Sequence, residues 1–181
     1  MKKVTNLLAS AAVAVAILFG TNAAKAQTTP ATSSNPNPWR LGFGVEGGIP
    51  TGDAHPAFGF ELGGSARLQY DVTSSVALTL TSGYTNFFLK SAYKQPEEPS
   101  SLGIVPAKLG VKWFFVPGIY LAGEAGAGIE TNGAKQTKLL LSPALGWANE
   151  HWDVGLNYTN YSGQGDNFGS VGLRLAYGFG L

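Results

Sequence analysis

Apolar and polar residues alternate along most of the chain, from Trp39 to the C-terminal Leu181. Runs of about ten residues carry a large apolar side chain at every second position, with glycine, serine, threonine or an isolated charge between them. Residues 171–181, VGLRLAYGFGL, show the pattern clearly. A period of two is typical of β-strands, because successive side chains point to opposite faces. Eight such runs predict an all-β protein, a closed antiparallel up-and-down barrel of eight strands.

The predicted connections between these runs alternate in length. Short turns are expected at 71–75, 116–118 and 149–151, and longer or more polar links at 50–57, 86–101, 131–137 and 162–167. Such alternation places the turns on one side of a barrel and the loops on the other, as in transmembrane barrels. Pro143 falls inside the sixth run, where it removes one backbone donor, so a bulge or a local break is expected there.

The tryptophans all fall at one kind of strand end. Two of them begin the first and seventh runs, and the other two end the fourth and sixth. Because odd runs begin and even runs end at the same side of an up-and-down barrel, all four lie at the short-turn side: Trp39, Trp152, Trp113 and Trp147. Other aromatic residues gather at the opposite, long-loop side: Phe58, Tyr84, Phe87, Phe88, Tyr158 and Tyr161. Indole has an apolar body and one polar N–H, which suits a membrane–water interface. The sequence thus predicts an aromatic girdle made by the four tryptophans.

Alternation alone does not say whether the apolar face lines the barrel or surrounds it. A soluble lipid-carrying barrel would bury that face, whereas a membrane barrel would turn it to lipid. The apolar faces carry no charged residue, and a basic residue at mid-membrane depth costs roughly 2–4 kcal/mol. Small residues dominate the other face and suit the narrow interior of eight strands. Residues 39–181 are therefore predicted to form a transmembrane barrel.

The polar face carries charges of both signs, which the barrel would enclose. The predicted lumen charge network consists of Arg40, Glu46, Glu61, Arg67, Lys108, Lys112, Glu124, Asp153 and Arg174. Eight strands leave room for side chains and little else, so these groups are expected to pair and fill the interior. The alternative is a water-filled path, which would make the protein a narrow pore for small solutes.

The N-terminus has the pattern of an export signal. Lys2 and Lys3 precede a 13-residue apolar run, and Ala24-Lys25-Ala26 supplies small residues at a cleavage site. A signal peptide over 1–26 is predicted, with an uncleaved anchor as the alternative, followed by a flexible leader over 27–38. Without residues 1–26 the chain has 9 basic and 11 acidic residues, a net charge of −2, which excludes a strongly basic nucleic-acid binder. The chain has no cysteine, so no disulfide stabilises it.

Catalytic chemistry has little support in the sequence. His55 and His151 fall at opposite ends of the predicted barrel, and no G-x-S-x-G motif is present. No catalytic residue, cofactor site or metal site is predicted, and a lipid-modifying outer-membrane enzyme is the less favoured alternative. The loop at 86–101, with its aromatic residues and Gln-Pro-Glu-Glu-Pro run, is the predicted contact surface for an external partner.

The alternating runs together with the closing segment, residues 171–181, resemble the small outer-membrane β-barrel proteins of Gram-negative bacteria, the OmpA-like and OmpX-like eight-stranded group. The segment is similar to the C-terminal signal that the outer-membrane assembly machinery reads, although it ends in Leu181 instead of an aromatic residue. The resemblance covers 39–181. It implies a location in outer-membrane lipid, both termini in the periplasm, transient contact with the assembly machinery, and a structural or surface-interaction role.

Overall fold

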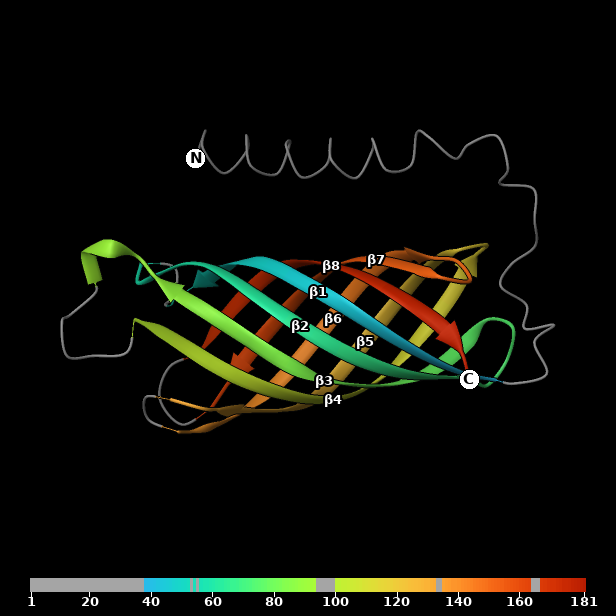
Figure 1. The fold of residues 1–181 in the computed structure, drawn as a ribbon, viewed down its shortest axis with the longest axis horizontal. Helices are drawn as coiled ribbons and strands as arrows, with labels where there is room; N and C mark the ends of the chain where they lie inside the picture. Colours follow the sequence, from blue (N-terminus) through green and yellow to red (C-terminus); the bar gives the residue numbers. More distant parts are fainter. Residues whose placement is uncertain (1–37, 53, 55, 94–99, 133–134, 164–166) are drawn as a thin grey trace, which may run out of the picture.

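The computed structural model describes residues 38–52, 54, 56–93, 100–132, 135–163 and 167–181. These residues form eight antiparallel strands and one 3-10 turn, in the order β1 (Trp39–Gly52), β2 (Phe58–Asp71), β3 (Val76–Leu89), η1 (Ser91–Tyr93), β4 (Ser101–Val116), β5 (Ile119–Glu130), β6 (Thr137–Ala148), β7 (Trp152–Ser162) and β8 (Phe168–Gly180). Each strand pairs with the next, and β8 returns to β1 (Figure 1). The predicted eight-stranded up-and-down barrel is confirmed.

Closure of the barrel depends on the seam between the first and last strands. β1 and β8 pair without interruption from Arg40–Gly180 to Gly52–Phe168. Each backbone N–H or C=O left unpaired in hydrocarbon costs several kcal/mol, so a continuous seam removes the edge that an open sheet would expose.

The two ends of the barrel differ. Connections 72–75, 117–118 and 149–151 lie at the end where β1 begins and β8 finishes, which we name the turn end (Figure 1). The links between β1 and β2, β3 and β4, β5 and β6, and β7 and β8 lie at the opposite end, which we name the loop end. The predicted signal peptide at 1–26 lies outside the described residues, as does the leader up to residue 37.

The apolar face of the strands points outward. In β4, Leu109 is 67% exposed while its neighbour Lys108 is 5% exposed, and this contrast recurs around the barrel. Leucine and valine at the outside of a barrel, with lysine inside, reverse the usual arrangement of a soluble protein. The orientation is the one expected of a barrel surrounded by lipid.

Pro143 interrupts one ladder without shifting it. β6 pairs with β7 at Leu141–Asn160 and again at Ala144–Asn157, in the same register, while its pairing with β5 continues through Gly123–Pro143. Because proline has no N–H, it cannot donate across this ladder. The irregularity expected at Pro143 is therefore a local break and not a bulge.

Two predictions about the loop end are wrong. Phe87 and Tyr161 were grouped with the aromatic residues of the long-loop rim as support for a lipid-facing surface, but both are buried inside the barrel. The long loop predicted at 86–101 is also shorter than expected, since β3 continues to Leu89 and β4 begins at Ser101. Phe87 follows the inward phase of Thr79 and Thr81 in the same strand, so the period of two, and not aromatic character, decides its side.

Candidate functional site

The interior of the barrel holds a cluster of paired charges contributed by six strands. We name it the lumen cluster, and its members are Glu46, Arg67, Lys108, Lys112, Glu124, Asp153 and Arg174. All seven belong to the predicted network. They meet because every one occupies the inward phase of its strand, in a lumen that is too narrow to keep them apart.

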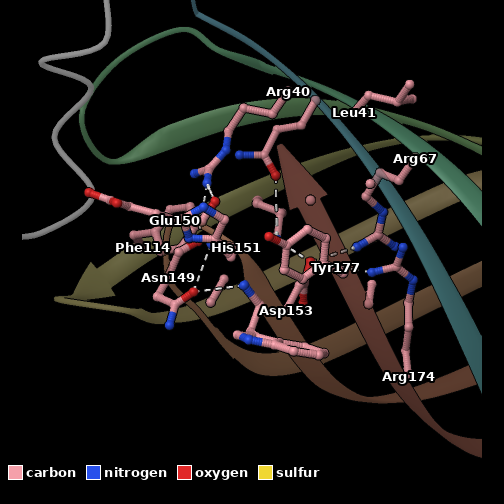
Figure 2. A pocket seen from close by; sticks show the side chains of 17 residues that line it. Arg40, Leu41, Arg67, Phe114, Asn149, Glu150, His151, Asp153, Arg174 and Tyr177 are labelled. Carbon is pink, nitrogen blue, oxygen red and sulfur yellow. Dashed lines mark hydrogen bonds and ion pairs between the residues drawn. The ribbon is translucent and has the colours of Figure 1, made fainter. Parts of the chain in front are cut away.

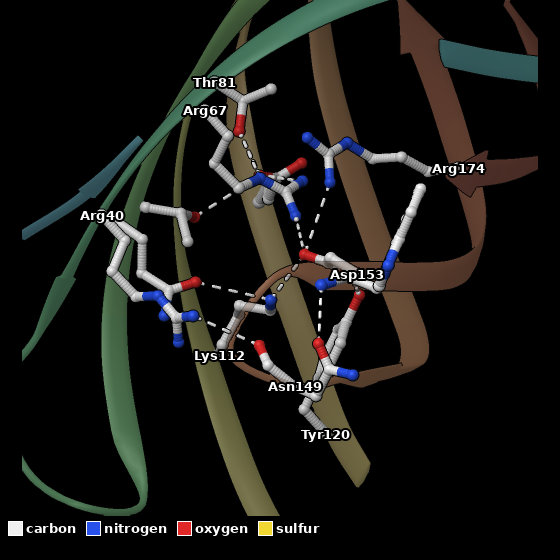
Figure 3. A network of polar contacts seen from close by, with 12 residues as sticks. Arg40, Arg67, Thr81, Lys112, Tyr120, Asn149, Asp153 and Arg174 are labelled. Carbon is white, nitrogen blue, oxygen red and sulfur yellow. Dashed lines mark hydrogen bonds and ion pairs between the residues drawn. The ribbon is translucent and has the colours of Figure 1, made fainter. Parts of the chain in front are cut away.

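Asp153 is the centre of the half of the cluster that faces the turn end (Figure 3). Its Oδ2 lies 2.7 Å from Lys112 Nζ and 3.4 Å from one Nη1 each of Arg67 and Arg174. The Tyr120 hydroxyl donates to Oδ1 at 2.6 Å. One carboxylate therefore serves three cations and a phenol, which fixes the position of all four donors.

Glu124 is the second centre. Its Oε1 accepts from Arg67 Nη2 at 2.9 Å and from the Thr81 hydroxyl at 2.7 Å, while Oε2 lies 3.1 Å from Lys108 Nζ. Arg67 joins the two centres, because its Nη2 donates to Glu124 and its Nη1 reaches Asp153. Its Nε donates to Thr81 Oγ1 at 2.9 Å. Such a connected set gives strong mutual positioning, and removal of one member leaves a buried charge without its partner.

Sequence reasoning missed several interior residues. Tyr120 bonds to Asp153, and its ring lies 4.0 Å from Lys112 Nζ, within cation–π distance. Lys138 and Glu130 form a further buried pair at 3.6 Å. All of these residues stand in the inward phase of their strands, so the same period-two rule that found the other charges would have found them.

Two predicted residues lie apart from the lumen cluster. Arg40 lies at the turn end and donates through Nη2 to the backbone carbonyls of Asn149 and Glu150. Glu61 lies toward the loop end, where Ser170 donates to its Oε1 at 2.6 Å and its Oε2 has no hydrogen-bond partner among the described residues. Arg40 therefore stabilises the turn between β6 and β7, and Glu61 occupies a separate polar position between the lumen cluster and the loop end.

Toward the loop end, the interior holds an apolar group beside the buried pair Lys138–Glu130, since Lys138 Nζ lies 5.7 Å from the centroid of the Phe168 ring. Buried side chains from five strands and the first loop pack together there, and we name this group the apolar plug: Ala54, Phe87, Ile104, Leu140, Tyr161 and Phe168. The rings of Tyr161 and Phe168 stack at 4.7 Å, and Phe87 meets each of them edge-on at 5.5 Å. The plug occupies the part of the lumen that lies beyond the lumen cluster, toward the loop end.

Two cavities lie inside the barrel among the described residues. A cavity of about 50 Å³ lies at the turn end, beside Arg40, Lys112 and Asp153 (Figure 2). A second, of about 20 Å³, lies between the lumen cluster and the apolar plug, beside Glu61 and Tyr161. One water molecule occupies roughly 10–15 Å³ on this measure. The first cavity therefore has room for a few water molecules, and the second has room for one or two.

The four tryptophans lie at the turn end, as their positions in the chain suggest. Trp39, Trp113 and Trp152 are exposed on the outside of the barrel, and Trp147 is half-buried against Gly118. Gly118 has a φ of +77°, and a Cβ there would lie 2.9 Å from the indole Nε1 of Trp147. Glycine at this turn therefore allows both the backbone conformation and the close approach of the indole.

Other site chemistry is not seen in the part of the chain that the structure describes. No group of three or more histidine, aspartate or glutamate residues there could hold a metal ion. No helix among the described residues is long and apolar enough to cross a membrane.

Comparisons by sequence and by structure give different results. No protein-family model and no curated protein sequence matches the chain. Among solved structures, Ail, the attachment invasion locus protein of Yersinia pestis, matches with a TM-score of 0.54 at 14% identity, over 78% of this chain and 97% of Ail. Ail in a phospholipid bilayer nanodisc gives a TM-score of 0.52 at 14% identity, with 76% and 99% covered.

The N-terminal β-barrel domain of Pseudomonas aeruginosa OprF also matches, with a TM-score of 0.50 at 15% identity, over 77% of this chain and 97% of that domain. At these identities the likeness concerns the fold, and it agrees with the closed strand order, the outward apolar face and the filled interior. The chain therefore has the fold of the small eight-stranded outer-membrane β-barrels.

Proposed function

We propose that this protein is an integral outer-membrane barrel with a closed lumen, and that its role is structural or one of surface interaction. It is neither a pore nor an enzyme in this proposal. The observation that carries the proposal is the presence of two different barriers in series, the lumen cluster and the apolar plug. Each barrier excludes solutes for its own physical reason.

The lumen cluster opposes permeation because its charges already satisfy one another. An ion passing Asp153 or Glu124 would have to displace cations held at 2.7–3.4 Å. Breaking one buried pair costs about 3–5 kcal/mol. The apolar plug adds a second barrier, since its side chains offer few polar partners to a hydrated solute.

Conductance in planar bilayers tests the closed lumen directly. The purified barrel is expected to give no stable conductance steps, whereas Phe87→Ala, which removes the ring at the centre of the plug, serves as a variant with a weakened barrier. Stable steps from the unmodified protein would refute the closed lumen and favour the narrow-pore alternative. Analysis of lipid A acyl chains on expression tests the enzyme alternative, and no change is expected.

We also propose that the turn end faces the periplasm and that residues 1–26 are removed on export, which leaves 27–38 as a leader. The turn end carries the four tryptophans and the start of β1, and the longer links lie at the loop end, an asymmetry typical of outer-membrane barrels. Outer-membrane lipid would surround the strands, and the assembly machinery would insert them.

The topology can be tested with introduced cysteines because the chain has none of its own. Tyr93, in η1 at the loop end, and Ser74, in the turn between β2 and β3, are both exposed. An impermeant maleimide is expected to label Tyr93→Cys on intact cells and Ser74→Cys only after lysis. The reverse labelling pattern would overturn the orientation, and recovery of the protein in the soluble periplasmic fraction would overturn the membrane location.

The loop end is the surface through which we propose that an external partner binds. The predicted contact segment 86–101 reduces to 90–100 once the strand residues are removed, and residues 94–99 of it lie outside the described part of the chain. Tyr93 presents an exposed ring there. Aromatic residues at exposed loops are favoured anchors of protein contacts.

A further inference from the structure

Glu61 in β2 differs from the other acidic residues inside the barrel. The other four, Glu46, Glu124, Glu130 and Asp153, each lie within 3.6 Å of a cationic nitrogen. Glu61 is only 9% exposed, yet no ion pair among the described residues includes it. A negative charge on Glu61 would therefore be buried without a counter-charge, which is costly.

The hydrogen bonds around Glu61 lack a donor. Ser170 donates to Oε1 at 2.6 Å, whereas Oε2 is buried with no partner among the described residues. The side-chain oxygen of Asn157 is also buried without a donor, and both side chains approach Gly172: a Cβ there would lie 2.7 Å from Asn157 Oδ1 and 3.5 Å from Glu61 Oε1. An ionised carboxylate only accepts, but a protonated carboxyl has one O–H to donate.

The chain encloses this carboxyl group closely. Gly48 and Gly172 face each other in the β1–β8 ladder, and a Cβ at Gly48 would lie 2.5 Å from Glu61 Oε1 and 2.7 Å from the carbonyl oxygen of Val171. Across the β2–β3 ladder, Glu61 is paired with Phe87 of the apolar plug. Backbone on one side and an aromatic ring on the other leave an ionised carboxylate poorly solvated, so the neutral form is favoured.

The charged and titratable groups around Glu61 come from four other strands: Glu46 in β1, Lys108 in β4, Tyr161 in β7 and Arg174 in β8, two residues beyond Gly172. Glu46 would repel an ionised Glu61, because the two carry the same charge. The ion-pair partner of Lys108 is Glu124, and those of Arg174 are Glu46 and Asp153. From β3 and β6 the second cavity receives uncharged side chains: Thr81, Thr85 and Leu140.

We propose that Glu61 is a proton-binding site of the folded barrel, and that loss of its proton places an unpaired negative charge against the apolar plug. In the unfolded chain Glu61 ionises above about pH 4.3, so folding at mildly acidic to neutral pH takes up one proton from water. The folded state then binds more protons than the unfolded state, and stability falls as the pH rises. This pH sensitivity is additional to the closed lumen and does not depend on it.

Urea unfolding of the detergent-solubilised barrel from about pH 5 to about pH 8 tests the proposal. The equilibrium constant for unfolding is expected to rise about tenfold per pH unit wherever the folded state holds one extra proton. Glu61→Gln supplies an amide that accepts from Ser170 and donates to Asn157, so it is expected to remove this dependence and to raise the urea midpoint at the alkaline end. Glu150→Gln, which changes an exposed carboxylate, is the control and is expected to keep the dependence.

Infrared spectroscopy detects the proton directly in the unmodified protein, whether or not the variant folds. A protonated-carboxyl band is expected in the folded barrel at mildly acidic pH, and it should shift on ¹³C labelling of glutamate and be absent from folded Glu61→Gln. Absence of the band, or an unchanged pH dependence in Glu61→Gln, would overturn the proposal. A urea midpoint that rises when sodium chloride replaces choline chloride, without the band, would assign a cation to Glu61 and overturn it as well.

Discussion

Glu124 gives the most direct test of the lumen cluster. Replacing it by alanine removes the acceptor for Arg67 Nη2 at 2.9 Å, for Lys108 at 3.1 Å and for the Thr81 hydroxyl at 2.7 Å. Asp153 still partners Arg67, but Lys108 loses the only ion-pair partner that it has among the described residues. The variant therefore leaves a buried ammonium without its counter-charge.

The expected magnitude follows from this loss. Breaking a buried pair by removing one partner costs about 3–5 kcal/mol. For a domain of this size, each kcal/mol lowers the unfolding midpoint by roughly 2–4 °C, so Glu124→Ala is expected to lower it by about 6–20 °C. The assay is the temperature at which the heat-modifiable band of the detergent-solubilised barrel disappears, supported by the loss of β-sheet circular dichroism.

The controls separate the missing charge from the missing volume. Glu150→Ala removes an exposed carboxylate in a turn and is expected to change the midpoint very little. In the double variant Glu124→Ala/Lys108→Met the stranded cation is also gone, so part of the stability should return. A Glu124→Ala midpoint equal to that of the unmodified protein would show that the cluster does not stabilise the barrel.

Three further substitutions test other parts of the molecule. Phe87→Ala, in the apolar plug, is expected to cost about 3–5 kcal/mol because it leaves a cavity between Tyr161 and Phe168, and a urea midpoint like that of the unmodified protein would contradict tight packing there. Tyr120→Phe keeps the ring and removes the 2.6 Å bond to Asp153, so a loss of about 1.5–3 kcal/mol is expected in the same assay. Leu109→Lys on the outside of β4 is expected to destabilise the barrel in phospholipid vesicles by about 2–4 kcal/mol, with Leu109→Ala as control; full tolerance of the lysine would mean that water, and not lipid, contacts this face.

The sequence was sufficient to predict the fold, because alternation of apolar and polar residues indicates β-strands with two different faces. Inward and outward positions follow from the period of two, so the lumen charges Arg67, Lys108, Lys112 and Glu124 were recognisable as interior groups without any structure. The same rule failed only where another signal was given more weight. Phe87 was grouped with the aromatic residues of the long-loop rim and with the loop at 86–101, although its phase in β3 places it inside the barrel.

The level of each inward residue along the barrel axis could not be predicted from the sequence. Lys112 in β4 and Asp153 in β7 meet across the barrel, yet no ladder joins their strands. Which residues share a level depends on the tilt and stagger of all eight strands together. For the same reason Arg40 and Glu61 were grouped with the lumen cluster, although one lies at the turn end and the other lies nearer the loop end.

The contact of the outer face with lipid explains why specific side-chain packing is concentrated in the lumen, in the lumen cluster and the apolar plug. In lipid, outward side chains such as Leu109 gain little from contact with protein, because the surrounding chains are equally apolar. Specific packing must then come from the lumen. There the lumen cluster joins strands that lie across the barrel from one another through directional bonds, and the apolar plug supplies the tight contacts that a soluble protein obtains from its core. A barrel of this kind therefore keeps its most demanding side-chain geometry inside, and substitutions there should affect its folding more than conservative apolar exchanges on the lipid-facing side.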